Sequence, residues 1–232
     1  MIPLRDENPS LTVPFVTRAL IVANTLVFVY ELLLGPDLRE FMNVWGLRPE
    51  RLVMSVSDHA SPLLPALATV FTSMFLHGGW SHLIGNMWYL YIFGDNVEDA
   101  LGHVPYLLFY LASGVTAAAL HTLTHVGSML PTVGASGAIA GVLGAYAFAY
   151  PGARVVTLVP LFPFFQIVRW PAWVVLGLWF VLQFILGVGS LGQSAAGTGG
   201  IAIWAHIGGF AFGWAAMALL GRRTAPAVAG AE

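Results

Sequence analysis

The sequence contains no cysteine, no lysine and few charged residues of any kind. Without cysteine the chain cannot form disulfide bonds or thiolate metal sites, and it cannot use a cysteine nucleophile. Its formal net charge is −2, and its basic side chains are nine arginines. A nucleic-acid-binding face needs a concentration of positive charge. These absences argue against a nucleic-acid partner.

Charged residues make up 9% of the 232 residues, whereas a soluble domain carries about 25%. Hydrophobic residues make up 58%, and the mean hydropathy is +0.80. This composition is typical of a polytopic membrane protein that folds as one compact domain in the lipid bilayer. We expect that domain to cover residues 18–221, between an N-terminal tail (1–17) and a C-terminal tail (222–232).

Six apolar segments qualify as candidate membrane spans, since ~20 residues cross a ~30 Å hydrocarbon core. They are Arg18–Leu34, Leu83–Val97, Val104–His125, Gly137–Tyr150, Ala172–Val188 and Ile201–Gly221. The second and fourth are the shortest. The connection Gly35–Ser81 mixes charged with apolar residues, which favours an interfacial, partly helical loop. The sequence therefore predicts an all-α fold: a compact bundle of six transmembrane helices with a long interfacial first loop.

The arginines are distributed unevenly about these spans. With six spans, one side of the membrane carries Arg5, Arg18, Arg154, Arg169, Arg222 and Arg223. The other side carries three arginines, all in the long first loop. The positive-inside rule then places both termini in the cytoplasm. The first residues also lack the pattern of a typical cleaved signal peptide.

Two polar residues stand out in otherwise uncharged stretches. Ser136 lies among glycines within residues 100–153, and His206 is the single histidine of residues 170–221. Counting from the inner end of each span puts both residues about 21–22 Å above the inner boundary. A hydroxyl and an imidazole at one depth suggest chemistry carried out inside the bilayer.

The short fourth span has a consequence for the chain before it. Residues 125–135 must enter the membrane to reach the start of the helix, and irregular backbone survives there only when it is buried in protein or lines a wet cavity. Gly134 and Gly137 permit the tight backbone that this entry requires. The helix N-terminus then directs free N–H groups toward Ser136, an arrangement that can stabilise an oxyanion.

His82 and Asn86 form a second polar pair at the start of the second span. Their i, i+4 spacing puts them on one face of a helix. Both side chains can donate hydrogen bonds, which suits them to hold a developing negative charge.

Three motifs follow one another on the second, fourth and sixth predicted spans. They are His77/His82/Asn86, Gly134-Ala135-Ser136-Gly137, and Ala205-His206-Ile207-Gly208-Gly209 with Gly213. Together with the six-span layout, from about Arg18 to Gly221, they resemble the rhomboid family of intramembrane serine proteases.

The resemblance implies a serine endopeptidase that cleaves transmembrane segments of membrane-protein substrates without a cofactor. Ser136 would be the nucleophile and His206 the general base, with no third acid. His82, Asn86 and the backbone N–H of Ser136 would line the oxyanion hole. The absence of soluble domains and the short tails favour a prokaryotic-type protein of the cell membrane.

The remaining motif residues would have structural roles near the site. His77 would lie near the cavity mouth, and Gly209 and Gly213 would let the sixth helix approach the fourth at Gly137 and Gly141. Some family members place a tyrosine four residues after the nucleophile, where it stacks on the base. Ala140 stands there in this chain, so the sequence leaves open how the base is oriented.

The residues taken alone leave other interpretations open. Ser136 could be a helix N-cap or a packing serine, because Gly137–Gly141 is also a GxxxG motif. His77 and His82 could be metal ligands, but no H-E-x-x-H motif or neighbouring carboxylate accompanies them, so no metal site is expected. A transporter could use the same polar cavity, although it would need midplane charges or a repeat of broken helices, and the spans from Val104 onward are uncharged. The main alternative to an enzyme is a non-catalytic membrane protein that binds transmembrane helices.

Overall fold

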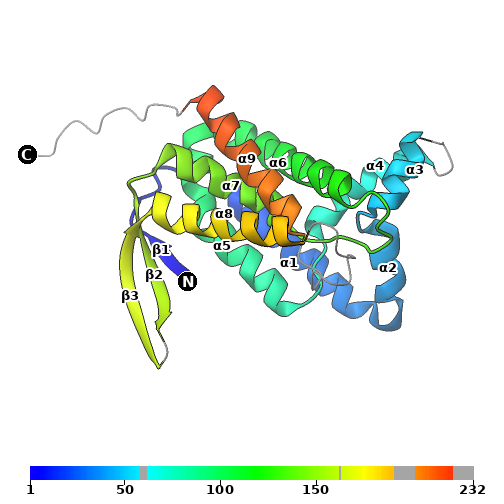
Figure 1. The fold of residues 1–232 in the computed structure, drawn as a ribbon, viewed down its shortest axis with the longest axis horizontal. Helices are drawn as coiled ribbons and strands as arrows, with labels where there is room; N and C mark the ends of the chain where they lie inside the picture. Colours follow the sequence, from blue (N-terminus) through cyan, green and yellow to red (C-terminus); the bar gives the residue numbers. More distant parts are fainter. Residues whose placement is uncertain (58–61, 162, 191–201, 222–232) are drawn as a thin grey trace, which may run out of the picture.

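The structure of the chain, a computed structural model, describes residues 1–57, 62–161, 163–190 and 202–221 (Figure 1). The helices are α1 (Phe15–Leu33), α2 (Leu38–Trp45), α3 (Pro49–Ser57), α4 (Leu63–Thr72), α5 (Trp80–Leu101), α6 (His103–Thr124), α7 (Ser136–Ala149), α8 (Ala172–Gly189) and α9 (Ile203–Leu220). The strands are β1 (Ile2–Asp6), β2 (Arg154–Leu161) and β3 (Phe164–Pro171). The fold is mostly helical, as the sequence predicts.

Each of the six predicted apolar segments coincides with one helix. Within the described ranges, α1, α6, α8 and α9 are long and apolar enough to cross a membrane. The helices α4 and α5 meet at a bend of 80° and qualify as a span only when taken together. The apolar helix α7 has 14 residues. The multi-pass membrane fold is therefore confirmed, while a count of six spans stays a prediction.

The second predicted span is longer than the sequence suggested. We expected it to end at Val97, before an acidic cluster, but α5 continues to Leu101 and has 22 residues. Glu98 lies inside this extension and is fully buried. The prediction of a short second span is wrong because this acidic residue is a packed, hydrogen-bonded part of the bundle.

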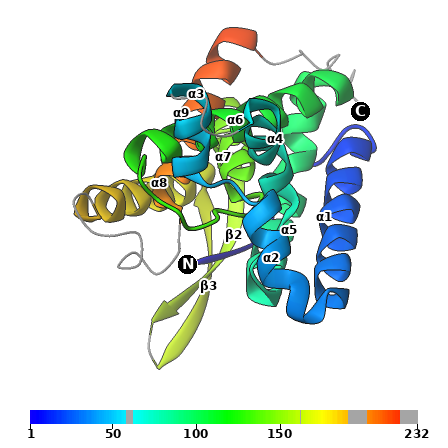
Figure 2. The same cartoon turned by 90° about the vertical axis from the view of Figure 1, so that its right-hand side faces the viewer.

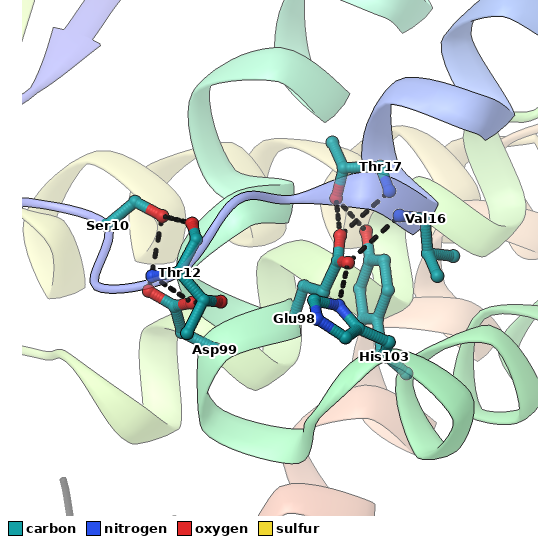
Figure 3. A network of polar contacts seen from close by, with 8 residues as sticks. Ser10, Thr12, Val16, Thr17, Glu98, Asp99 and His103 are labelled. Carbon is teal, nitrogen blue, oxygen red and sulfur yellow. Dashed lines mark hydrogen bonds and ion pairs between the residues drawn. The ribbon is translucent and has the colours of Figure 1, made fainter.

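Figure 3 shows why the helix can continue past Glu98. Its carboxylate accepts hydrogen bonds from the backbone N–H groups of Val16 (2.9 Å) and Thr17 (2.8 Å) and lies 2.5 Å from His103 Nδ1. The neighbouring Asp99 accepts the backbone N–H groups of Leu11 and Thr12. Glu98 thereby satisfies two free N–H groups in the first turn of α1, and Asp99 ties the segment before α1 to the end of α5.

The long first loop folds into short helices, as expected. It contains α2, α3 and α4 with two short 3₁₀ turns, Gly35–Asp37 and Ser73–Phe75. In Figure 1 these helices lie at one end of the bundle, and the N-terminal strand β1 lies toward the other. The loop is joined to the segment before α7 by a bridge between Leu47 and Thr132.

A three-stranded antiparallel sheet, which the sequence did not predict, lies at the end of the bundle opposite α2, α3 and α4 (Figure 1). Its order is β1-β2-β3, so the connection between α7 and α8 is a β-hairpin with β1 along one edge. The pairs run from Ile2–Leu158 to Asp6–Val155 and from Arg154–Pro171 to Leu161–Phe164. Residues 2–6 are thus part of the folded domain, while residues 222–232 lie outside the described part of the chain.

The helix α7 lies at the centre of the bundle. Every residue from Gly137 to Tyr146 is buried. This short helix has no polar face, and its small residues allow neighbouring helices to approach it on several sides. The fold therefore surrounds the start of α7, where Ser136 lies, with protein.

Candidate active site

Ser136 and His206 lie against each other between α7 and α9. Ser136 is the first residue of α7, and its Oγ is 2.8 Å from Nε2 of His206, which lies in the first turn of α9. With the ring proton on Nδ1, the hydroxyl donates to Nε2. The two residues are 70 positions apart in the sequence, so their meeting depends on how the two helices pack.

Glycines set the close approach of α7 and α9. A Cβ at Gly209 would lie 2.0 Å from the carbonyl oxygen of Gly137, and one at Gly213 would lie 1.9 Å from that of Gly141. Real Cβ atoms essentially never come this close to another atom. Any side chain at either position would push the helices apart and separate Ser136 from His206.

Gly134 shapes the turn before the serine. Its φ of +129° favours glycine, and a Cβ there would lie 2.6 Å from Nε2 of His82. Its N–H donates to the carbonyl of Ser73 at 2.9 Å, which holds this segment against the first loop. The turn and the imidazole of His82 are therefore packed directly against each other next to Ser136.

His82 and Asn86 face the same cavity from α5. This cavity of about 590 Å³ is lined by Ser136, His206, His82, Asn86, Ala140 and Gln183, among others. Nδ2 of Asn86 is buried and has no hydrogen-bond partner within the described residues. An unpaired buried amide is costly, and here it is a donor available to a charge that develops beside Ser136.

His77 lies outside this cavity. It is 1% exposed, and its backbone N–H donates to the buried carboxylate of Glu31 at 3.1 Å. Its ring packs edge to face against the ring of His82, with 5.2 Å between the ring centroids. It thus packs behind His82, and it lines a separate cavity of about 770 Å³ together with Glu31.

Two contacts of His206 were missed in the sequence, and both come from α8. Oε1 of Gln183 is 3.2 Å from Nδ1 of His206, so it can accept the proton that this tautomer carries. The centroid of the Trp179 ring lies 5.9 Å from the centroid of the His206 imidazole, and the two ring planes form an angle of 36°. Ala140 offers no ring, and these residues orient the imidazole instead. Gln183 is the lone amide in an apolar segment, and that could have indicated its role.

No metal centre is evident in the part of the chain that the structure describes. No three His, Asp or Glu side chains gather there in a way that could hold an ion. The side chains that line the cavity supply a hydroxyl, imidazoles and amides, which suit nucleophilic attack and hydrogen-bond stabilisation of an oxyanion.

Comparison with known families gives a match to the rhomboid domain over residues 65–223. The matched region contains α5, α7 and α9, and it covers more than half of the sequence. The chain belongs to the rhomboid family. This agrees with the resemblance carried by the three motifs.

Curated relatives match parts of this rhomboid chain. The human "Presenilin-associated rhomboid-like protein, mitochondrial" is 30% identical over 151 residues, which is 62% of this chain and 36% of the relative. The Arabidopsis thaliana "Rhomboid-like protein 11, chloroplastic" is 40% identical over 77 residues, or 33% and 27% of the two chains. The Bacillus subtilis (strain 168) "Putative rhomboid protease YdcA" is 37% identical over 81 residues, or 34% and 39%. The chain thus spans about a quarter to two fifths of the length of these relatives.

Proposed function

We propose that this rhomboid protein is an intramembrane serine endopeptidase that uses Ser136 as nucleophile and His206 as general base. The observation that carries the proposal is the 2.8 Å contact between Ser136 Oγ and His206 Nε2 inside a cavity of the helical bundle. A serine hydroxyl becomes an effective nucleophile when an adjacent base takes its proton. Family membership supports a protease-like function of the same kind.

The proposed reaction uses the side chains of the cavity in turn. His206 Nε2 takes the hydroxyl proton as Ser136 Oγ attacks a substrate peptide carbonyl. The oxyanion that forms accepts hydrogen bonds from Asn86, His82 and the backbone N–H of Ser136. His206 then gives the proton to the leaving amine, and the peptide C–N bond breaks to leave an acyl-enzyme. A water molecule, deprotonated by His206, then attacks the ester carbonyl of the acyl-enzyme. This step releases the carboxylic acid product and restores the Ser136 hydroxyl.

Gln183 takes the place beside the base that a carboxylate occupies in a triad. Its amide oxygen is neutral, so it can orient Nδ1–H without the charge that an aspartate would supply to an imidazolium. Holding the proton on Nδ1 leaves Nε2 free to accept from the serine. In this proposal Ser136 and His206 form the catalytic pair, and the neutral amide of Gln183 orients the imidazole.

The proposed substrates are transmembrane segments of other membrane proteins. A helical segment hides its backbone, so cleavage favours segments that unwind easily near a small residue. Substrate would enter between α8 and the rest of the bundle. Glycines in residues 187–200, which begin in the last turn of α8, would permit this movement, although most of these residues lie outside the described part of the chain.

The cellular setting forms part of the proposal. The chain is a multi-pass membrane protein, and the arginine distribution favours both termini in the cytoplasm. We propose the cell membrane as its location. The names of its relatives include mitochondrial and chloroplastic proteins as well as a bacterial one, so fractionation of cells expressing the chain is the check on this point.

The test is covalent modification of the purified protein in detergent by a fluorophosphonate, which reacts with activated serines. We expect labelling of the wild type and none of Ser136→Ala or His206→Ala. Ser81→Ala is the matched control, because Ser81 lines the same cavity and has no part in the mechanism. Cleavage of a transmembrane substrate should follow the same order.

An unlabelled, inactive wild type would overturn the proposal. In that case a non-catalytic protein that binds transmembrane helices becomes the better interpretation. Substrate binding that survives Ser136→Ala would then be its signature.

A further inference from the structure

The β-hairpin between α7 and α8 ends in an apolar tip that projects from the bundle. We use "hairpin tip" for the distal residues Val159, Pro160, Phe164, Phe165, Gln166 and Ile167. Among the residues that the structure describes, β2 beyond Leu158 pairs with β3 alone, because the pairs of β1 stop at Ile2–Leu158. The tip is therefore a two-stranded ribbon, a structure of marginal stability in water unless something covers it.

Three exposed side chains of the tip are large and apolar. Phe164 and Phe165 are each 71% exposed, and Ile167 is 66% exposed. Successive residues of a strand point to opposite faces, so Phe164 and Phe165 present apolar surface on both sides of the ribbon. The sequence has no charged residue between Arg154 and Arg169. A contiguous apolar surface of this kind marks an interaction site.

The base of the hairpin is fixed to membrane-spanning helices. β3 ends at Pro171, and α8 begins at the next residue. The N–H of Ala172 donates to the carbonyl of Ala153 (2.8 Å), and the N–H of Trp173 donates to that of Pro151 (3.1 Å). These bonds hold the start of the hairpin at the level where α8 enters the bilayer. Trp173, in the first turn of α8, is 61% exposed, as expected of an aromatic residue at the membrane interface.

The direction of the hairpin decides what the tip can touch. In Figure 1 the hairpin runs across the direction of α8, and in Figure 2, turned by 90°, it again projects past the helices. A hairpin that starts at the membrane boundary and runs sideways from the bundle stays beside the lipid surface. Its tip is therefore continuous with the lipid-facing surface of α8.

We propose that the hairpin tip inserts into the headgroup and acyl boundary of the leaflet next to it and acts as an interfacial anchor. Phe164, Phe165 and Ile167 would enter the boundary, as aromatic and aliphatic side chains do in monotopic proteins. Arg154 is exposed at the hairpin base, where it can remain among the headgroups. The anchor would fix the inner ends of α7 and α8, the helices that carry Ser136 and Gln183. This inference does not depend on protease activity.

The cysteine-free sequence allows a direct test. Phe165→Cys and Ile167→Cys would each carry a nitroxide in protein reconstituted into phosphatidylcholine vesicles containing phosphatidylglycerol. Oxygen concentrates in lipid and a nickel chelate in water, so relative collision rates report depth. Leu26→Cys is the lipid reference, since Leu26 is 64% exposed in the middle of α1. Pro9→Cys is the aqueous control, because Pro9 is exposed in a polar segment near Asp99 at the same end of the molecule.

We expect the oxygen-to-nickel ratio at residues 165 and 167 to be several-fold higher than at residue 9 and lower than at residue 26, as a position at the headgroup and acyl boundary requires. Ratios equal to that at residue 9 would overturn the proposal. Spin–spin broadening that disappears on dilution with unlabelled protein would also overturn it, because it would mean that a second copy covers the tip. Thermal unfolding of each labelled variant against the unlabelled chain verifies that the fold is retained.

Discussion

Replacing Gly213 by alanine is the sharpest test of how the helices bring Ser136 and His206 together. The added Cβ would lie 1.9 Å from the carbonyl oxygen and 2.5 Å from the carbonyl carbon of Gly141. Ordinary contact begins at 3.4 Å, so α7 and α9 must separate by about 1.5 Å at this level. Both obstructing atoms belong to backbone, and neither can move aside as a flexible side chain would.

The cost can be estimated from the effect of overpacking. Extra methyl groups in a packed core typically cost 1–3 kcal/mol, and a backbone obstruction should reach about 3 kcal/mol. For a chain of this length that corresponds to a fall in unfolding temperature of roughly 6–12 °C. A helix shift of this size would also stretch the 2.8 Å contact between Ser136 and His206 beyond hydrogen-bond range. A misplacement of about 1 Å can reduce a rate ~100-fold, so fluorophosphonate labelling should slow by about that factor.

Gly177→Ala is the matched control, since a Cβ at Gly177 meets nothing within 4 Å. We expect the stability of this variant to be unchanged or raised by about 0.5–1 kcal/mol, because alanine has a higher helix propensity than glycine. Thermal unfolding in detergent and labelling rates are measured on both variants. If Gly213→Ala unfolds and labels like Gly177→Ala, the packing argument is wrong.

Three further predictions follow from the site and the sheet. Gln183→Leu should slow labelling by about 2–10-fold, the equivalent of one net hydrogen bond, with an unchanged unfolding temperature; an unchanged rate would mean that His206 is oriented without it. Asn86→Ala should reduce substrate cleavage by about 10²–10³-fold, as loss of an oxyanion-hole donor does, without loss of stability, because its Nδ2 has no partner to lose. Burial raises the pKa of Asp6 above its ordinary range, so the folded state holds this proton more tightly and stability falls as pH rises through the raised pKa. Asp6→Asn keeps an acceptor for the Tyr146 hydroxyl but cannot titrate. As the pH rises through the raised pKa, the unfolding temperature of the wild type should therefore fall more than that of the variant. Parallel curves of unfolding temperature against pH would contradict the raised pKa of Asp6.

Hydropathy located the helices well, because long apolar runs leave few alternatives to a span. The segment predicted at Val104–His125 is α6, His103–Thr124. Hydropathy misplaced the end of α5 because the acidic residue Glu98 was taken as the end of the membrane span. Glu98 is fully buried, and its partners at residues 16 and 17 lie about 80 positions away. A local pattern carries no information about such a distant donor.

The sheet escaped prediction for a similar reason. Residues 154–171 contain prolines at 160, 163 and 171, which favour a loop. The pairing that completes the sheet joins residues 2–6 to residues 155–158. Such a long-range contact leaves no periodic signal in either segment.

The residues of the candidate site were predicted more fully than the neighbouring residues that hold them in place. Matching depth for Ser136 and His206 follows from helix geometry and span ends, and the two side chains do meet. Gln183 was missed because its meaning depends on the rotation of α8 about its own axis. Packing against α7 and α9 sets that rotation, and hydropathy does not report it.

The helix that contacts the proposed base, α8, is also the least buried of the four described helices that are long enough to span a membrane. Within its most apolar stretch α8 is 22% buried, against 44% for α6 and α9, so fewer packed contacts resist its displacement. Ser136 and His206 remain together through the glycine contacts of α7 with α9, and these do not involve α8. A movement of α8 that admits a substrate helix would therefore leave the serine–histidine contact intact while it withdraws Gln183 from Nδ1. Access to the cavity and orientation of the imidazole are then coupled through a single helix, and full reactivity should return only when α8 closes on the bound segment.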